Sequence, residues 1–328
     1  MSEVSAKASA FVSAHLAEAA LLGERLADEI GEPEAFVATL KGGLAALADP
    51  AYTEMTARVS PDVPAELMVR GPLTEAVQRP LKRALREASS MIALHLAGRL
   101  IAERQRSLRL FAMPCLRRSL AEDPEQSWQL MRRMARRAGD WIEVDTLADV
   151  WARGVLAEGF RWAEIEQLVF SERTYERRLV GATLATIPHR VPSQRREALR
   201  PDAIERSLEM IRQLMGDAEV MVQKALSWAI REWTPVDVSA VATFLEAETA
   251  IAAETRDGAR AWVIRDALAK QPPSLTADLR ARLDGIRRVG SAPSTSIAST
   301  QAAAFAAALA SSNDAVAAQG DRYTRSRA

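Results

Sequence analysis

Apolar and polar residues recur along the chain with the period of amphipathic helices, and short turns interrupt this pattern. Residues 1–58 predict two or three helices, which are separated by Gly-Glu-Pro at 31–33 and Asp-Pro at 49–50. From about Pro72 onward, helical segments alternate with short turns that contain Asp, Gly or Pro, such as Met215-Gly216-Asp217. The pattern therefore predicts an all-α protein.

Composition supports this prediction and divides the chain into three parts. Ala, Leu, Arg and Glu are strong helix formers and dominate the sequence, whereas aromatic residues make up only 5% of it. Beyond Arg288 the sequence consists mainly of Gly, Ser, Thr, Pro and Ala. We expect an N-terminal helical cap or extension over 1–70, a repeat domain over 71–288, and a low-complexity, disordered tail over 289–328.

Self-similar segments indicate a helical repeat. Four segments run from a turn or charged residue into an apolar helix, starting at Arg109, Asp145, Arg178 and Lys224, and a weaker copy starts at Arg260. The first four starts are 36, 33 and 46 residues apart, the size of a two-helix unit. Such pairs bury their apolar faces by stacking, so we expect a curved α-solenoid of antiparallel helix pairs with inner helices along a concave surface. Asp145 stands where three other copies carry Arg or Lys.

Helical spacing groups several aromatic and charged residues on the faces of these inner helices. Trp141 and Asp145 are four residues apart and share a face. The same spacing groups a second and a third set, and four arginines form ridges on the preceding helix. These residues are Lys224, Trp228 and Arg231; Tyr175 and Arg178; and Arg132, Arg133, Arg136 and Arg137. Taken singly, the indoles have a simple interpretation as packing residues and the cations as solvated or ion-paired charges.

Three segments resemble the signature segments of bacterial alkylpurine DNA glycosylases of the AlkD type, a family with HEAT-like repeats. They are Trp141-Ile142-Glu143-Val144-Asp145, Tyr175-Glu176-Arg177-Arg178-Leu179 and Val222 to Glu232. The resemblance implies that Asp145 is the catalytic carboxylate, that Trp141 and Trp228 flank the deoxyribose of the lesion, and that Arg178 contacts the DNA backbone. It further implies duplex DNA with cationic N3- or N7-alkylated purines as substrate and no cofactor. Tyr175 stands where relatives commonly have Trp.

The chemistry of glycosidic cleavage suits these residue types. An alkylated purine already carries positive charge, and the sugar gains oxocarbenium character as the bond breaks. A carboxylate stabilises that charge and positions water, while indole faces favour cations. We expect Tyr175, Lys224, Arg231, Arg109 and the four arginines at 132–137 to contact the DNA backbone together with Arg178.

Other classes of chemistry lack support in the sequence. The sequence contains no phosphate-binding glycine loop. It has three scattered His residues and a single Cys, and these do not indicate a metal-binding cluster. The residues around Cys115 do not match the surroundings of a catalytic nucleophile. No segment has the composition of a membrane span. We expect a cytoplasmic, monomeric protein without metal.

Charge keeps two alternatives open. Residues 1–70 hold 5 basic and 11 acidic side chains, whereas residues 71–290 hold 35 basic and 30 acidic ones, a modest excess for a DNA-binding protein. A non-catalytic repeat protein that binds branched or damaged DNA is one alternative, and a protein–protein scaffold is the other. The set of Trp141, Asp145 and Trp228 favours catalysis over both.

Overall fold

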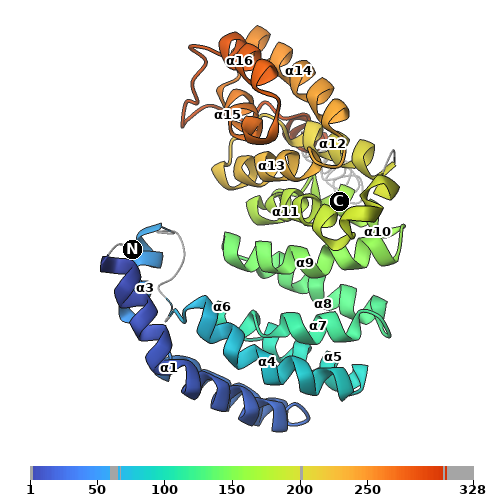
Figure 1. Cartoon of the computed structure of the whole chain (residues 1–328). Coiled ribbons are helices and arrows are strands. Elements are labelled where there is room, and N and C mark those ends of the chain that lie inside the picture. The colour runs from blue at the N-terminus through green and yellow to red at the C-terminus, as the bar shows by residue number, and fades with distance from the viewer. Residues whose placement is uncertain (1–2, 60–65, 67, 200–201, 306, 309–328) are drawn as a thin grey trace, which may run out of the picture. The chain divides into compact units, whose positions relative to one another are not determined.

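The computed structural model of the chain is built from α-helices and short 3-10 helices, as the sequence predicts (Figure 1). It describes residues 3–59, 66, 68–199, 202–305 and 307–308, and these contain no β-strand. The chain divides into two compact units, residues 1–154 and 155–328.

Unit 1 consists of antiparallel and stacked helices around an apolar core. The long helix α1 packs along α4, while α5 packs against α2, α7 and α8. Trp128 and Trp151 lie in the core with their ring centroids 4.5 Å apart. The helices are α1 (Glu3–Asp28), α2 (Pro33–Ala46), α3 (Pro50–Val59), α4 (Gly71–Glu87), α5 (Ser90–Ile101), α6 (Arg106–Arg109), α7 (Ala112–Ser119), α8 (Pro124–Arg137) and α9 (Trp141–Ala157), whose last three residues belong to unit 2.

Proline and polar caps set the ends of these helices where the sequence predicts breaks. Pro33, Pro50 and Pro124 are the first residues of α2, α3 and α8, a position that needs no backbone N–H donor. Ser89 caps α5, because its hydroxyl accepts from the backbone N–H of Ile92 at 3.3 Å.

Within the predicted cap or extension over 1–70, described residues pack against later parts of unit 1. Besides the packing of α1 along α4, the carboxylate of Asp49 accepts hydrogen bonds from the N–H of Ala51 and pairs with Arg70, just before α4. The carboxylate of Glu66 accepts from the backbone N–H groups of Arg106 and Ser107. The predicted turn at 60–64 lies outside the described residues.

Unit 2 is organised around α11 and α13, which run side by side (Figure 1). Gly181 permits the close approach, because a Cβ there would lie 2.8 Å from the Cβ of Ala225. Helix α15 packs against α13 and α14. The elements are α10 (Arg161–Leu168), α11 (Thr174–Arg190), the 3-10 helix η1 (Ser193–Leu199), α12 (Asp202–Leu214), α13 (Val220–Trp233), α14 (Val238–Thr255), α15 (Gly258–Ala267), the 3-10 helix η2 (Leu268–Lys270) and α16 (Pro273–Arg282).

The beginning of the low-complexity tail, for which the sequence predicts disorder, contacts residues that are distant in sequence. The backbone N–H of Thr295 donates to the carbonyl of Gly216 at 3.0 Å. Ser296 has no exposed surface and Ala298 only 1%. Hydroxyl groups of the segment thus contribute to its contacts with the rest of unit 2. Residues 306 and 309–328 lie outside the described part of the chain.

Candidate functional site

Equivalent residues of the repeat are identified by their place in each helix. Asp145, Arg178 and Lys224 are each the fifth residue of α9, α11 and α13, which is the alignment that the sequence indicates. The fifth residue of α15 is Trp262, so the weak copy aligns at this indole and not at Arg260. In the first copy α6 begins at Arg106, which makes Arg109 its fourth residue. The row of charged residues therefore does not include Arg109.

The fourth residues of α6, α11 and α13 each bind the loop that precedes their own helix. The Arg109 guanidinium donates to the backbone carbonyls of residues 103 and 104, six and five positions earlier. Arg177 donates in the same way to the carbonyls of Ser171 and Glu172, at 2.8 and 3.1 Å. Gln223 donates to the carbonyls of residues 217 and 218, again six and five positions earlier. Each side chain fixes the loop that precedes its own helix.

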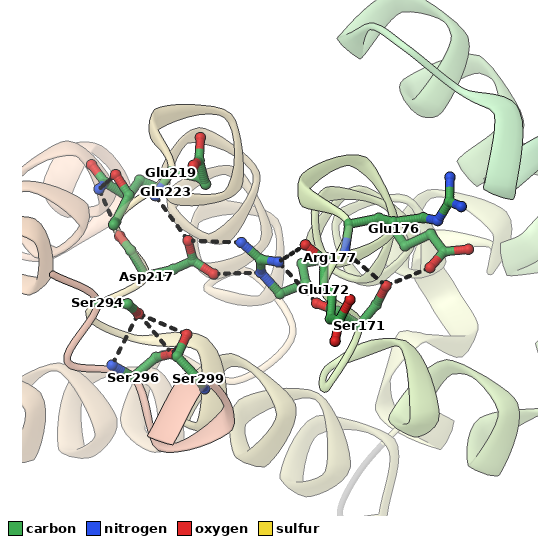
Figure 2. Close-up of polar contacts among 12 residues, drawn as sticks. Ser171, Glu172, Glu176, Arg177, Asp217, Glu219, Gln223, Ser294, Ser296 and Ser299 are labelled. Carbon is green, nitrogen blue, oxygen red and sulfur yellow. Dashed lines mark hydrogen bonds and ion pairs between the residues drawn. The ribbon is translucent and has the colours of Figure 1, made fainter. Parts of the chain in front are cut away.

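The two arginines also bind a carboxylate at the start of a later helix. Figure 2 shows Arg177 between the carbonyls of its own loop and the carboxylate of Asp217, whose Oδ2 lies 2.7 Å from Nε of the arginine. Arg109 makes the matching contact with Glu143, at 2.6 and 2.8 Å. Within each unit, these bridges set the position of one helix start relative to another.

These contacts hold Arg109, a predicted DNA contact, within unit 1. Its side chain is only 9% exposed and its partner Glu143 is fully buried. Burial disfavours the charged guanidinium, but the hydrogen bonds and charge of Glu143 outweigh it, and the pKa of Arg109 is raised. The guanidinium is bound by Glu143 and by two backbone carbonyls.

The first turn of α9 is held by a buried polar network. Asp140 precedes the helix, and its Oδ1 accepts from the N–H of Glu143 at 2.9 Å. Its other oxygen pairs with the buried Arg106. Trp141 and Asp145, one turn apart on this helix, are both half-buried. The network thus fixes the backbone from which both side chains extend.

The tryptophans fall into two groups by burial. Trp128, Trp151 and Trp233 have at most 1% exposed surface and form core packing. Trp141 and Trp228 are half-buried instead, so part of each indole faces solvent. A half-exposed indole is available to contact a sugar or a cation, as the glycosylase interpretation requires.

In unit 2, the candidate DNA contacts have different surroundings. Arg178 is buried, and its Nη1 donates to the carbonyl of Met221 on α13 at 2.6 Å. Tyr175 is half-buried and Lys224 is exposed. Arg231 pairs with Asp266 and donates to its carbonyl. Among the described residues, the Nζ of Lys224 has no ion-pair partner, which leaves it available to an anion.

The arginines of α8 do not form a uniform strip. Arg132 is half-buried, whereas Arg133, Arg136 and Arg137 are exposed. Arg137 reaches the end of α5, where it donates to the carbonyls of residues 101 and 103 at 2.6 and 3.2 Å. It therefore stabilises a helix C-terminus.

Metal and thiol chemistry find no site in the described part of the chain. No three His, Cys, Asp or Glu side chains there are grouped to hold a metal ion. Cys115 is fully buried, and burial raises the pKa of its thiol to about 12, as expected for a structural cysteine. Within the described residues, no helix combines the length and hydrophobicity that a membrane span needs.

Comparison with known families decides the assignment. The family described as DNA alkylation repair enzyme matches residues 40–270. The chain belongs to this family. No curated protein and no solved structure matches the sequence. Membership of the DNA alkylation repair enzyme family indicates a role in the repair of alkylated DNA, and the match includes α9, α11 and α13 with all of the candidate site residues.

Sequence reasoning missed three residues of this DNA alkylation repair enzyme. Arg177 bridges two helix starts, Trp262 occupies the fifth position of α15, and Arg288 lies over the Trp262 ring, 5.4 Å from its centroid. The recurring spacing of six and five residues to the loop carbonyls would have distinguished Arg177 from Arg178. Arg288 had no such signal, because its partners are distant in sequence.

Proposed function

We propose that this DNA alkylation repair enzyme is a monofunctional DNA glycosylase that hydrolyses the N-glycosidic bond of cationic N3- and N7-alkylated purines in duplex DNA. The observation that carries the proposal is the pair Trp141 and Asp145. Both are half-buried and one turn apart at the start of α9, while the neighbouring carboxylates Asp140 and Glu143 are buried against arginines.

In the proposed reaction, the bond between C1′ of the deoxyribose and the purine nitrogen breaks, and its electron pair leaves with the base. The cationic alkylpurine departs as a neutral molecule, and positive charge develops on the sugar. The carboxylate of Asp145 stabilises that charge and accepts a proton from the water that adds to C1′. The indole of Trp141 favours both the cationic base and the cationic sugar, by roughly 0.5–2 kcal/mol.

The remaining contacts belong to the same proposal. Trp228 would flank the sugar, and Arg178 would contact the backbone at the lesion. Other side chains would bind phosphates along the duplex without reading sequence. Tyr175 would donate a hydrogen bond through its hydroxyl. The others would bind by charge: Lys224, Arg231, Arg132, Arg133, Arg136 and Arg137, the last by exchanging a carbonyl for a phosphate.

Release of 7-methylguanine and 3-methyladenine from methylated duplex DNA tests the proposal. We expect wild-type protein to release at least one of these bases, and Asp145→Asn to release far less because the variant has the same size and no charge. Asp123→Asn is the matched control, since Asp123 precedes α8 and makes no side-chain cap hydrogen bond. A wild-type protein that binds methylated DNA but releases neither base would be a non-catalytic DNA-binding protein instead.

A further inference from the structure

A pocket in unit 2 lies where the low-complexity tail passes the starts of α13 and α15. Its volume is about 260 Å³. Val220 and Gln223 contribute from the first turn of α13, and Gly258 from the start of α15. The segment 287–295 supplies the opposite wall, together with Arg256. We call this site the tail pocket.

The tail wall is anchored by contacts on both sides. The hydroxyl of Thr295 donates to the carboxylate of Asp257, and the N–H of the same residue donates to the carbonyl of Gly216 at 3.0 Å. At the other end, the backbone of Arg287 lies directly on Gly258, where a Cβ would be 2.0 Å from the Arg287 carbonyl oxygen. This glycine therefore permits the contact that holds Arg287 and Arg288 at the pocket.

Positive charge dominates the lining. Arg256, Arg287 and Arg288 are all exposed. The lining carboxylate, Asp257, is 7% exposed and already accepts from Thr295 and Arg260. Asp284 reaches Arg287 only at 4.0 Å, and both side chains are largely exposed, so this pair contributes little.

Arg288 is held in place within this pocket. Its Nη1 donates to Oε1 of Gln223 at 3.0 Å, and its guanidinium lies 5.4 Å from the centroid of the Trp262 ring. Gln223 in turn is 1% exposed and fixed by two loop carbonyls. Lys224, the fifth residue of α13 and a proposed DNA contact, follows Gln223 directly. Arg288 is therefore bound to a buried residue of α13 that directly precedes a proposed DNA contact.

We propose that the tail pocket binds a phosphate group of the DNA backbone, with Arg287 and Arg288 as its principal cations. The inference rests on the proposed function only in taking duplex DNA as the ligand. It assigns a binding role to a tail segment whose composition alone indicated disorder. A free phosphate ion shares the same chemistry, so the test must separate the two sources.

The test is the salt dependence of binding to undamaged duplex DNA, measured by fluorescence anisotropy with the full chain. Each phosphate contact contributes about 0.9 to the slope of log K against log salt concentration. We expect Arg287→Gln/Arg288→Gln to lower that slope by about 1 relative to wild type, because one phosphate contact is lost. The control is Arg280→Gln/Arg282→Gln, which removes the same charge from exposed positions of α16 outside the pocket and should leave the slope unchanged.

An unchanged slope in the pocket variant, or an equal decrease in both double variants, overturns the proposal. Titration with inorganic phosphate forms the second arm: if the pocket variant loses phosphate binding while its DNA slope equals wild type, the ligand is free phosphate and the DNA assignment is overturned. Thermal unfolding should show both variants folded; the control should match wild type, and the pocket variant should lose only the small contribution of the Arg288 contacts with Gln223 and Trp262. Base release by the wild-type protein is measured separately. A wrong pocket assignment changes only the salt-dependence result, whereas a wrong glycosylase proposal changes only the base-release result.

Discussion

At the scale of single residues, the start of α9 carries groups that differ in burial. Asp140 and Glu143 are buried and bound to arginines, whereas Trp141 and Asp145 are half-buried. The sequence predicted the spacing of Trp141 and Asp145 because a helix brings residues four apart together. It could not predict the burial of Glu143, which depends on Arg109 from a helix 34 residues earlier.

The two classes of indole give a prediction about activity and stability. Replacing Trp141 by Ala should lower single-turnover base release by roughly 2- to 30-fold, the equivalent of one lost cation–π contact of roughly 0.5–2 kcal/mol. Urea unfolding should change far less than for Trp151→Ala, which empties a core position and costs about 3–5 kcal/mol. Normal base release by folded Trp141→Ala would contradict the proposed role of this indole.

At the scale of helices, buried ion pairs join the starts of neighbouring elements. The links from Arg109 to Glu143 and from Arg177 to Asp217 use the same position of the repeat, the fourth residue of a helix. The spacing of charged residues aligned Arg109 with Arg178. In the structure Arg109 is the fourth residue of its helix and Arg178 the fifth, so the two positions differ by one residue. The two side chains therefore have different partners: Arg109 binds Glu143, whereas Arg178 donates to the carbonyl of Met221.

Removal of the Arg109 guanidinium should therefore affect folding first. Arg109→Ala leaves Glu143 buried without its partner and should cost about 3–5 kcal/mol in the free energy of unfolding, measured with urea. Arg133→Ala, on the exposed face of α8, should cost less than about 0.5 kcal/mol. The interpretation fails if Arg109→Ala unfolds like wild type and loses DNA affinity instead.

A second helix start carries a pH-dependent contribution. Burial disfavours the Asp49 carboxylate, but hydrogen bonds from Arg70, Tyr52 and Ala51 outweigh it and lower its pKa. Because the folded pKa lies below the unfolded one, the stabilisation is present above pH of about 4 and is lost as the pH falls through the folded pKa. We expect Asp49→Asn to cost about 1–2 kcal/mol at pH 7 and to approach wild type in acid.

The control for this pair is Glu54→Gln, since Glu54 and Arg58 form an exposed ion pair on the adjoining helix. Its effect should remain below about 0.5 kcal/mol at any pH. A cost for Asp49→Asn that stays constant down to pH 2 would show that its charge is not the cause.

At the scale of the whole molecule, the all-α class followed from helix-forming composition and from turns at prolines such as Pro33, Pro50 and Pro124. The tail did not follow from composition. Thr295 is held by the carboxylate of Asp257 and the carbonyl of Gly216, which lie 38 or more positions away in sequence, and no local pattern encodes such contacts. Family membership indicates a role in the repair of alkylated DNA.

Single-turnover release of 7-methylguanine or 3-methyladenine, with enzyme in saturating excess over methylated duplex, is the most direct measurement of the central claim. Saturation removes differences in DNA affinity, so the rate constant reports the chemical step. The proposed role of Asp145 predicts that Asp145→Asn lowers this rate constant by about 100-fold or more, while Asp123→Asn matches wild type. Equal rate constants for Asp145→Asn and wild type would contradict it.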